Sequence, residues 1–499
     1  MADLSEWAAT QPDTAAIISP QGRRTYRELD ANANRLARAL RRRGLGPGDA
    51  VALLSGNRPE FAEVFFACQR SGLRLTPVNW HLTGDEAGYI VADCEAKAMV
   101  ADHEVGELAR AARAASPACD VALAYGGDVE SFESYEDALA DEDPGELQDR
   151  ARGGTMLYTS GTTGRPKGVF RPTVAAPVVA NLGGYADGGG DVHLCTGPLY
   201  HAAPLSFSLS IPLVFGATVV LMETWDAEHA LELIAEHRVT HTHMVPTMFH
   251  RLLSLPEVVR GGYDVSSVRH VLHGAAPCPV PVKHRIIEWF GPVVMEYYAA
   301  TEGVGSFVDS ATWLQRPGTV GLPLTPGQVI VGDENATPLA HGEVGLIYIL
   351  APEGLAFSYF KDDAKTQSAY RGSYFTLGDI GYFDEDGYLY LTDRSANLII
   401  SGGVNIYPAE VDGLLLEHPA VADAATIGVP SDEWGEVVLS IVELQRDVVP
   451  SDALAEELIT FCRARLAHFK CPRQIEFIDA LPRQDNGKIY KRLLREQRR

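Results

Sequence analysis

The spacing of apolar residues predicts the secondary structure along the chain. Apolar side chains at positions 29, 33, 36, 37 and 40 fall on one helical face. Thr25 and Glu28 make a capping box before them, and Gly44 offers a C-terminal stop. A further helix is predicted at 227–238, and short apolar runs predict strands at 50–55, 98–101, 121–125 and 217–222. Helices alternating with such strands predict an α/β fold with parallel sheets.

Composition and charge narrow the class of protein. The 499 residues predict roughly three or four folding units. A net charge of −24 disfavours nucleic acid and anionic membranes as partners. A long uncharged stretch, 194–222 with histidines counted as neutral, holds three prolines, so we expect buried core and no membrane span. Seven scattered cysteines without a CxxC pair, and the lack of a signal sequence in residues 1–13, predict free thiols and a cytoplasmic location.

Two segments have an unusual charge balance. Residues 128–149 hold ten acidic residues and no basic one, which predicts a solvated connector. Residues 463–499 hold eleven Lys and Arg against four Asp and Glu. We expect most of these basic residues to be solvated, with one or two facing a polyanionic ligand.

The sharpest motif is a Gly- and Thr-rich loop at residues 159–168. Glycines let the backbone approach an anion, and successive N–H groups and hydroxyls donate to phosphate oxygens. Lys167 is followed by Gly168, whereas a Walker A loop needs Ser or Thr there, so kinases and GTPases are disfavoured. The residues predicted to bind phosphate are Thr159, Ser160, Gly161, Thr162, Thr163, Gly164 and Lys167.

This loop resembles the signature loop of the adenylate-forming superfamily. Further segments resemble that family's other motifs in the same order: 198–201, 273–277, 297–303, 375–379 with 393–394, 401–408 and 486–489. The resemblance covers nearly the whole chain and implies a freestanding acyl-CoA synthetase of the fatty-acid–CoA ligase type.

The resemblance implies the nucleotide contacts. Tyr298 is expected to stack on adenine, Asp379 to accept both ribose hydroxyls, and Arg394 to donate to the ribose from the hinge side. The other expected cofactor contacts are Gly274, Ala275, Ala276, Pro277, Gly402 and Gly403.

The resemblance also implies the catalytic residues and the need for ATP, Mg²⁺ and coenzyme A. Thr301 and Glu302 are expected to hold a phosphate oxygen and Mg²⁺, with Glu302 as the metal ligand. Lys488 brings positive charge to the carboxylate and α-phosphate as they combine. His201 is expected to close the acyl pocket, and its alternative is an ordinary core histidine.

The implied architecture has two domains. Residues 1–393 form a large N-terminal domain of several subdomains with layered β-sheets and helices, 394–397 form a hinge, and 398–499 form a small mobile α+β domain carrying Lys488. The implied reaction makes acyl-adenylate and pyrophosphate from acid and ATP, then transfers the acyl group to coenzyme A as the small domain reorients.

The carboxylic acid is less well specified. Residues 199–203 lack the aspartate that binds the ammonium of amino-acid substrates, so a non-amino acid is expected. Small residues in the predicted pocket walls suggest room for a medium- or long-chain acid or a bulky polycyclic one. They are Gly183, Gly184, Ala202, Ala203, Ala299 and Ala300.

Two residues depart from the family's motifs, and other functions than an ordinary acyl-CoA synthetase are open. Ala299 replaces a glycine, and Ala396 replaces a hinge Asp or Lys that balances the two domain orientations. The hinge change predicts a slow thioester step, or one completed by another protein or a carrier-protein thiol. The alternative from a different functional class is a non-catalytic family member that binds nucleotide or acyl-adenylate without turnover. The oligomeric state is open, and a homo-oligomer is possible.

A group of four histidines and one cysteine also contain side chains that can bind metal or react. His237, His241, His243 and His250 invite a zinc hypothesis, but the alternation around 241–243 favours a strand. Cys278 lies beside the predicted adenine pocket, and nothing nearby indicates a lowered thiol pKa, so we interpret it as a bystander.

Overall fold

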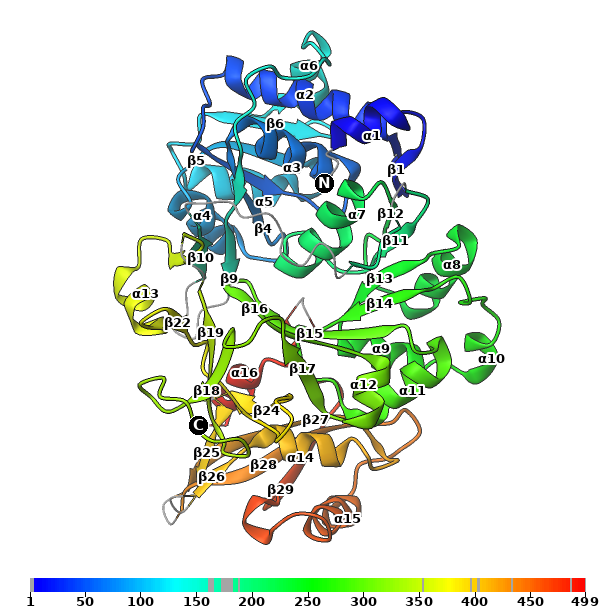
Figure 1. Ribbon diagram of the computed structural model, residues 1–499, viewed down its shortest axis with the longest axis vertical. Coiled ribbons are helices and arrows are strands. Elements are labelled where there is room, and N and C mark those ends of the chain that lie inside the picture. Colours follow the sequence, from blue (N-terminus) through cyan, green and yellow to red (C-terminus); the bar gives the residue numbers. More distant parts are fainter. Residues whose placement is uncertain are drawn as a thin grey trace.

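The computed structural model describes residues 4–159, 166–171, 183–186, 189–351, 354–394, 397–401, 404–431, 434–484 and 487–498. The chain is a mixed α/β protein with a large N-terminal part and a small C-terminal part (Figure 1). The C-terminal part, orange to red, lies at the bottom of Figure 1 beneath the green and yellow strands.

A parallel sheet forms the upper region of Figure 1, with the strand order β7-β6-β5-β3-β4-β8. Its strands are β3 (Ala50–Leu54), β4 (Arg74–Val78), β5 (Ala96–Asp102), β6 (Val121–Tyr125), β7 (Glu133–Ser134) and β8 (Gly154–Thr155). The helices around it are α2 (Tyr26–Arg42), α3 (Pro59–Ser71), α4 (Gly84–Asp93), η1 (His103–Val105), α5 (Gly106–Ala114) and α6 (Tyr135–Ala140). Alternate residues of β3 pack against α2 and α3 on one face and against α4 and α5 on the other, so every β3 residue is buried.

A 15-stranded sheet within the described residues runs through the middle of the molecule. Its parallel half contains β1 (Ala15–Ser19), β12 (Thr218–Leu221), β11 (Val192–Cys195), β13 (His241–Met244), β14 (His270–His273) and β15 (Val294–Ala300), with β2 (Gly22–Thr25) antiparallel at the edge. Its antiparallel half contains β16 (Gly303–Asp309), β17 (Thr319–Pro323), β24 (Leu389–Arg394), β23 (Asp379–Phe383), β19 (Gly345–Leu350), β18 (Val329–Gly332), β22 (Tyr374–Phe375) and β21 (Tyr370–Arg371).

Helices cover both faces of the parallel half. They are α1 (Leu4–Thr10), the π-helix η3 (Pro204–Ser210), α7 (Ile211–Val214), α8 (Ala227–His237), α9 (Pro246–Leu253), α10 (Glu257–Arg260), α11 (Val280–Phe290) and α12 (Ser310–Gln315). A small antiparallel sheet, β9 (Leu157–Thr159), β10 (Lys167–Phe170) and β20 (Ser358–Tyr359), lies beside α13 (Asp363–Ala369) and brackets the predicted phosphate loop.

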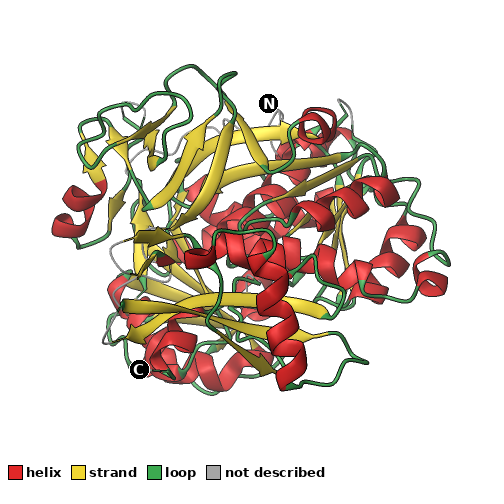
Figure 2. Ribbon diagram, turned by 90° about the horizontal axis from the view of Figure 1, so that it is seen from below, coloured by secondary structure: helices red, strands yellow, loops and turns green. Residues whose placement is uncertain are grey.

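The C-terminal part has its own sheet of β25 (Ile399–Ser401), β26 (Val404–Ile406), β27 (Val421–Ser431), β28 (Gly435–Leu444) and β29 (Gln474–Ile478). Its helices are α14 (Pro408–Leu415), α15 (Asp452–Arg463), η5 (His468–Lys470) and α16 (Lys491–Glu496). Figure 2 shows these strands as a layer separate from the strands of the N-terminal part.

The local predictions from sequence are confirmed where short-range chemistry decides the structure. Thr25 and Glu28 form a capping box, the predicted apolar face of α2 is fully buried, and Gly44 has a φ of 89° just after the helix. The predicted strands and the helix at 227–238 are present within one or two residues of their expected ends. Residues 194–222 are buried core as expected, and no helix among the described residues could span a membrane.

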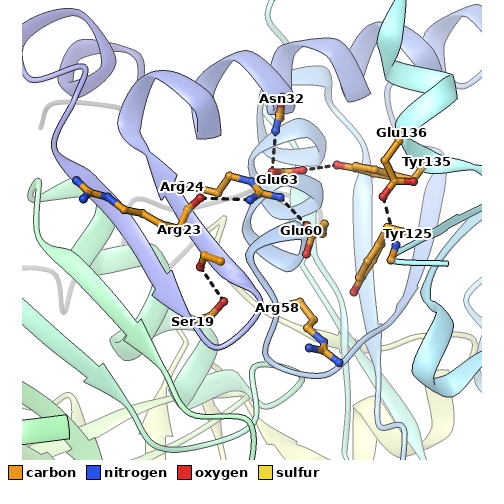
Figure 3. A network of polar contacts seen from close by, with 12 residues as sticks. Ser19, Arg23, Arg24, Asn32, Arg58, Glu60, Glu63, Tyr125, Tyr135 and Glu136 are labelled. Atoms are coloured by element: carbon orange, nitrogen blue, oxygen red, sulfur yellow. Dashed lines mark hydrogen bonds and ion pairs between the residues drawn. The ribbon is translucent and has the colours of Figure 1, made fainter.

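The prediction of a solvated connector at 128–149 is confirmed for the acidic side chains, nine of which are exposed, but the segment also contains secondary structure and buried residues. Residues 133–140 form β7 and α6, and Tyr135 is buried. Its hydroxyl donates to the Glu63 carboxylate at 2.8 Å, and Arg24 and Asn32 donate to the same carboxylate at 2.9 Å (Figure 3). The acidic side chains of the segment pair with the basic end of α2, in contacts such as Arg42–Glu142 at 2.6 Å. Burial of Tyr135, Leu139 and Leu147 in the core of the N-terminal part folds this stretch onto the core, and the ion pairs lie beside it.

Candidate active site

A cavity of about 2950 Å³ opens where the carboxyl ends of β13, β14 and β15 meet η3 and the C-terminal part. This is the end of a parallel sheet where ligands bind in open α/β folds. Many of the predicted site residues line it: Thr159, Lys167, His201, Ala275, Ala276, Pro277, Tyr298, Thr301, Glu302, Asp379 and Lys488. The fold thus brings together residues separated by more than half of the chain.

Several predicted site residues are not among those lining the cavity. Gly274 lies behind the wall, where an added Cβ would come within 2.6 Å of Tyr297, so only glycine fits there. The side chain of Arg394 is not described, although its backbone pairs with Asp379. The predicted residues Ser160, Gly161, Thr162, Thr163, Gly164, Ala396, Gly402 and Gly403 lie outside the described residues.

The predicted nucleotide side of the cavity is built on β15 and β23. The Tyr298 hydroxyl donates to Asp379 Oδ2 at 2.7 Å, and Asp379 is 7% exposed. Ala275, at the end of β14, has a φ of 69°, a left-handed conformation that is uncommon outside glycine and turns the chain sharply into the cavity wall. An aromatic ring and a carboxylate therefore face the same space as a strained backbone turn.

The Thr301–Glu302 pair is held from two directions. The Tyr359 hydroxyl donates to Glu302 Oε1 at 2.9 Å, and burial raises the pKa of Tyr359, which keeps it a proton donor. Arg171 Nη2 donates to the carbonyl oxygens of Thr301 at 3.0 Å and Glu302 at 2.6 Å. Burial lowers the pKa of Arg171. These contacts tie the turn after β15 to β10 and β20.

Lys167 forms an ion pair with Asp362 at 2.9 Å and lines the cavity. The Lys167 ammonium lowers the pKa of the Asp362 carboxyl through that hydrogen bond. A phosphate group entering the loop would meet a lysine that already has a carboxylate partner.

Lys488 reaches the cavity through a loop that contacts the N-terminal part. Thr247 Oγ1, on α9, donates to the carbonyl oxygen of Gly487 at 3.1 Å. Arg483 Nη1 donates to the same carbonyl at 2.6 Å and to Thr247 Oγ1 at 3.3 Å, and burial lowers the pKa of Arg483 to about 10. Lys488 thus lines the same cavity as His243 of β13 and Tyr298 of β15.

The structure also places the histidines and the cysteine about which the sequence raised hypotheses. His201 lines the cavity with its ring centroid 4.6 Å from that of Tyr200. His241 and His243 are buried in β13 as the strand prediction required, whereas His237 ends α8 and His250 lies on α9. Burial raises the pKa of the Cys278 thiol, consistent with an unreactive bystander.

The small residues expected to open the acyl pocket do so only in part. Ala202, Ala203, Ala299 and Ala300 line the cavity. Gly183 instead lies against Tyr185 and Gly184 against His270, where an added Cβ would come within 2.5 Å and 3.3 Å of those side chains. These two glycines make room for neighbouring rings instead of enlarging the pocket.

Sequence reasoning missed four residues that hold the site: Arg171, Thr247, Tyr359 and Asp362. Arg171 is a charge directly after the apolar end of β10, and that signal could have drawn attention to it. The other three lie in segments without a motif, and their roles follow only from contacts across the fold.

Comparison with known proteins identifies the class. A model of the AMP-binding enzyme family matches residues 4–360, and one of the AMP-binding enzyme C-terminal domain matches residues 410–488. The chain therefore belongs to the AMP-binding enzyme family.

Its relatives include several ligases that it matches over nearly the whole length of both chains. The chain is 34% identical to the 2-succinylbenzoate–CoA ligase of Bacillus licheniformis, covering 98% of both chains. It is 32% identical to a fatty acid–[acyl-carrier-protein] ligase of Streptomyces coeruleorubidus (98% of this chain, 94% of that one) and 33% identical to a feruloyl-CoA synthase of Amycolatopsis (98% and 97%). The structure of an anthranilate CoA ligase in complex with anthranoyl-AMP superposes with a TM-score of 0.89 at 25% identity, over 99% of this chain and 96% of that one.

Proposed function

We propose that this protein is an AMP-forming acid–thiol ligase. It joins a carboxylic acid to ATP as an acyl-adenylate, releases pyrophosphate, and transfers the acyl group to coenzyme A. The observation that carries the proposal is one cavity lined by Lys488 of the C-terminal part together with Tyr298, Glu302 and Asp379 of the N-terminal part. The free thiols and the use of ATP and coenzyme A fit a cytoplasmic enzyme.

Each of these residues suits one part of the first half-reaction. Tyr298 offers a ring to adenine, and Asp379, which accepts a hydrogen bond from Tyr298, offers a carboxylate to the ribose hydroxyls. Lys488 places a positive charge where the acid carboxylate attacks the α-phosphate, so it stabilises charge that develops in the transition state. The carboxylate of the acid is the nucleophile. Pyrophosphate is the leaving group and takes the electron pair of the broken bond to the α-phosphate.

Glu302 fits the role of a Mg²⁺ ligand. It lines the cavity, and its Oε1 accepts one hydrogen bond from Tyr359, which leaves further carboxylate lone pairs for a hard cation. Mg²⁺ bound there would neutralise phosphate charge. Arg171 holds the backbone on which Glu302 is presented.

The acyl acceptor allows a second candidate function. A fatty acid–[acyl-carrier-protein] ligase is among the relatives, and Ala396 lacks the side chain that balances domain orientations in the family. The Lys488 loop also contacts Thr247, an arrangement suited to adenylation. These observations favour an adenylation-dominant ligase whose thioester step is slow or uses a carrier-protein thiol.

Two measurements test both candidates. Acid-dependent exchange between ATP and pyrophosphate reports adenylation, and its absence with a broad panel of fatty, polycyclic and aromatic acids would indicate a non-catalytic nucleotide-binding protein. Single-turnover kinetics with coenzyme A reports the second step. Equal rates for both steps, with Ala396→Asp changing neither, would leave an ordinary acyl-CoA synthetase.

A further inference from the structure

The acyl side of the cavity lies on the opposite face of β15 from the nucleotide side. Side chains alternate along a strand, so Tyr298 turns toward Asp379 while Tyr297 and Ala299 turn toward η3. Tyr297 and Ala299 pack in one cluster with Phe207 and Ile211. This inference rests on the proposed function, because it takes this region as the place where the acid's chain or ring is held.

Three rings form the end wall of that region. Phe207 from η3, His243 from β13 and Tyr297 from β15 line the cavity and are 9%, 2% and 4% exposed. Phe207 stacks on His243 with centroids 5.8 Å apart, and its centroid lies 5.1 Å from that of Tyr297. His243 Nε2 and the Tyr297 hydroxyl form a hydrogen bond of 2.9 Å. The wall is therefore aromatic, and its polar group is the hydrogen-bonded pair of His243 Nε2 and the Tyr297 hydroxyl.

A second layer of rings fills the space behind the wall. His193, His241 and His270 are register partners on three neighbouring parallel strands. Tyr185 stacks on His241 with centroids 4.3 Å apart, and its hydroxyl lies 2.7 Å from His193 Nδ1. The empty space among these rings is about 10 Å³, which is room for about one water molecule. An alkyl tail cannot continue through this layer.

The hydrogen-bonded pair of His243 and Tyr297 in the wall is neutral. Burial lowers the pKa of His243 to about 4 and raises that of Tyr297, so neither side chain is charged near pH 7. One hydrogen bond joins them, and a tyrosine hydroxyl has one donor and two acceptor sites, so it can bind one more neutral partner. A second carboxylate on the substrate would lose its hydration without meeting a counter-charge at this wall.

We propose that the acid is a compact hydroxyaryl acid of the benzoic or cinnamic type, with its ring against Phe207 and its ring hydroxyl bound by the Tyr297–His243 pair. The filled second layer blocks a longer acid in the direction of the wall, the three rings favour an aromatic body, and the neutral pair selects a hydroxyl. This class differs from the medium- or long-chain or polycyclic acid expected from sequence. Four of the six small residues behind that expectation line the cavity, whereas Gly183 and Gly184 accommodate rings of the protein.

The test compares six acids in ATP–pyrophosphate exchange with the full chain: 4-hydroxybenzoate, 4-hydroxycinnamate, benzoate, cinnamate, terephthalate and decanoate. We expect each hydroxylated acid to exceed its unsubstituted counterpart at least tenfold in kcat/KM, and terephthalate and decanoate to be the poorest. Exchange that is fastest with decanoate or terephthalate would overturn this inference and leave the proposed ligase function intact. A lack of exchange with these and all other acids would overturn the ligase function itself.

A pair of variants locates the hydroxyl contact. Tyr297→Phe removes only the wall hydroxyl, and the ratio of kcat/KM for 4-hydroxycinnamate over cinnamate should fall about tenfold, toward one. Tyr185→Phe removes a buried hydroxyl in the layer behind the wall, and the ratio should stay within twofold of wild type. A wild-type ratio in Tyr297→Phe would place the hydroxyl contact elsewhere and overturn the assignment, as would equal loss in both variants.

Discussion

The hydroxyl of Tyr298 donates a hydrogen bond of 2.7 Å to the carboxylate of Asp379. The bond joins β15 to β23, and it brings the residue expected to stack on adenine into contact with the residue expected to bind ribose. The two act as one unit, because moving either side chain changes the position of the other.

Asp379→Ala should weaken ATP binding at least about a hundredfold, since hydrogen bonds to a charged group contribute about 1.5–3 kcal/mol each and two ribose hydroxyls lose their acceptor. Tyr298→Ala should have a smaller effect, because stacking contributes about 1–3 kcal/mol. Calorimetry with a non-hydrolysable ATP analogue measures both, and Tyr298→Phe separates the ring from the hydroxyl. Equal affinity in folded Asp379→Ala would show that the ribose lies elsewhere.

Lys488→Ala should slow acyl-adenylate formation by about 10²–10³-fold while ATP still binds, because one preorganised charge contributes about 3–4 kcal/mol to the transition state. Lys97→Ala is the matched control: Lys97 is half-exposed, pairs with Asp49 and lies away from the cavity. Pyrophosphate exchange is the measurement. If the two variants exchange alike, Lys488 has no part in adenylation.

Thr247→Val should slow adenylation about threefold to tenfold, because it removes the hydrogen bond of 3.1 Å to Gly487 that holds the Lys488 loop, and such a bond contributes about 0.5–1.5 kcal/mol. Transfer from preformed acyl-adenylate to coenzyme A should change less than twofold. Thr325→Val, at an exposed turn, is the control for both rates. Equal slowing of both steps by Thr247→Val would argue against a role specific to adenylation.

Acidification should destabilise the protein between pH 6.5 and pH 4. Burial lowers the pKa of His243 to about 4 and those of His193 and His273 well below 6.5, so the unfolded chain binds these protons first. Their contribution is fully present above pH 6.5 and is lost as pH falls, by about 1.4 kcal/mol per pH unit for each histidine. Urea unfolding at pH 4.5, 5.5, 6.5 and 7.5 measures the slope.

Removal of one of these buried rings checks their role: His193→Gln should reduce the slope, because burial lowers the pKa of His193. A flat stability profile across this range in wild type would mean that these histidines are not neutral in the fold.

Glu63→Ala should lower the free energy of unfolding by about 3–5 kcal/mol, the usual cost of removing one partner from a buried ion pair. Glu63 is 1% exposed and accepts from Arg24, Asn32 and Tyr135, as Figure 3 shows. Glu130→Ala breaks an exposed pair with Arg110 and should cost less than about 1 kcal/mol. Similar urea midpoints for the two variants would contradict a stabilising role for this network.

Features that depend on neighbouring residues along the chain could be predicted from the sequence. The capping box of Thr25 and Glu28 and the apolar runs that became β3 and β6 act over a few residues, so their structure follows from local chemistry. Ordered motifs also identified the family and Tyr298, Asp379 and Lys488 as cavity residues, because a reaction demands those side chains in a recognisable local context.

Contacts between distant segments could be known only from the folded structure. Thr247 meets Gly487, Tyr359 meets Glu302, and Tyr135 folds an acidic stretch onto Glu63, and no local pattern encodes these pairings. The shape of the acyl pocket belongs to the same group. Whether Gly183 opens a space or makes room for Tyr185 depends on which ring packs against it, and that is settled only when strands, helices and loops from across the chain are brought together.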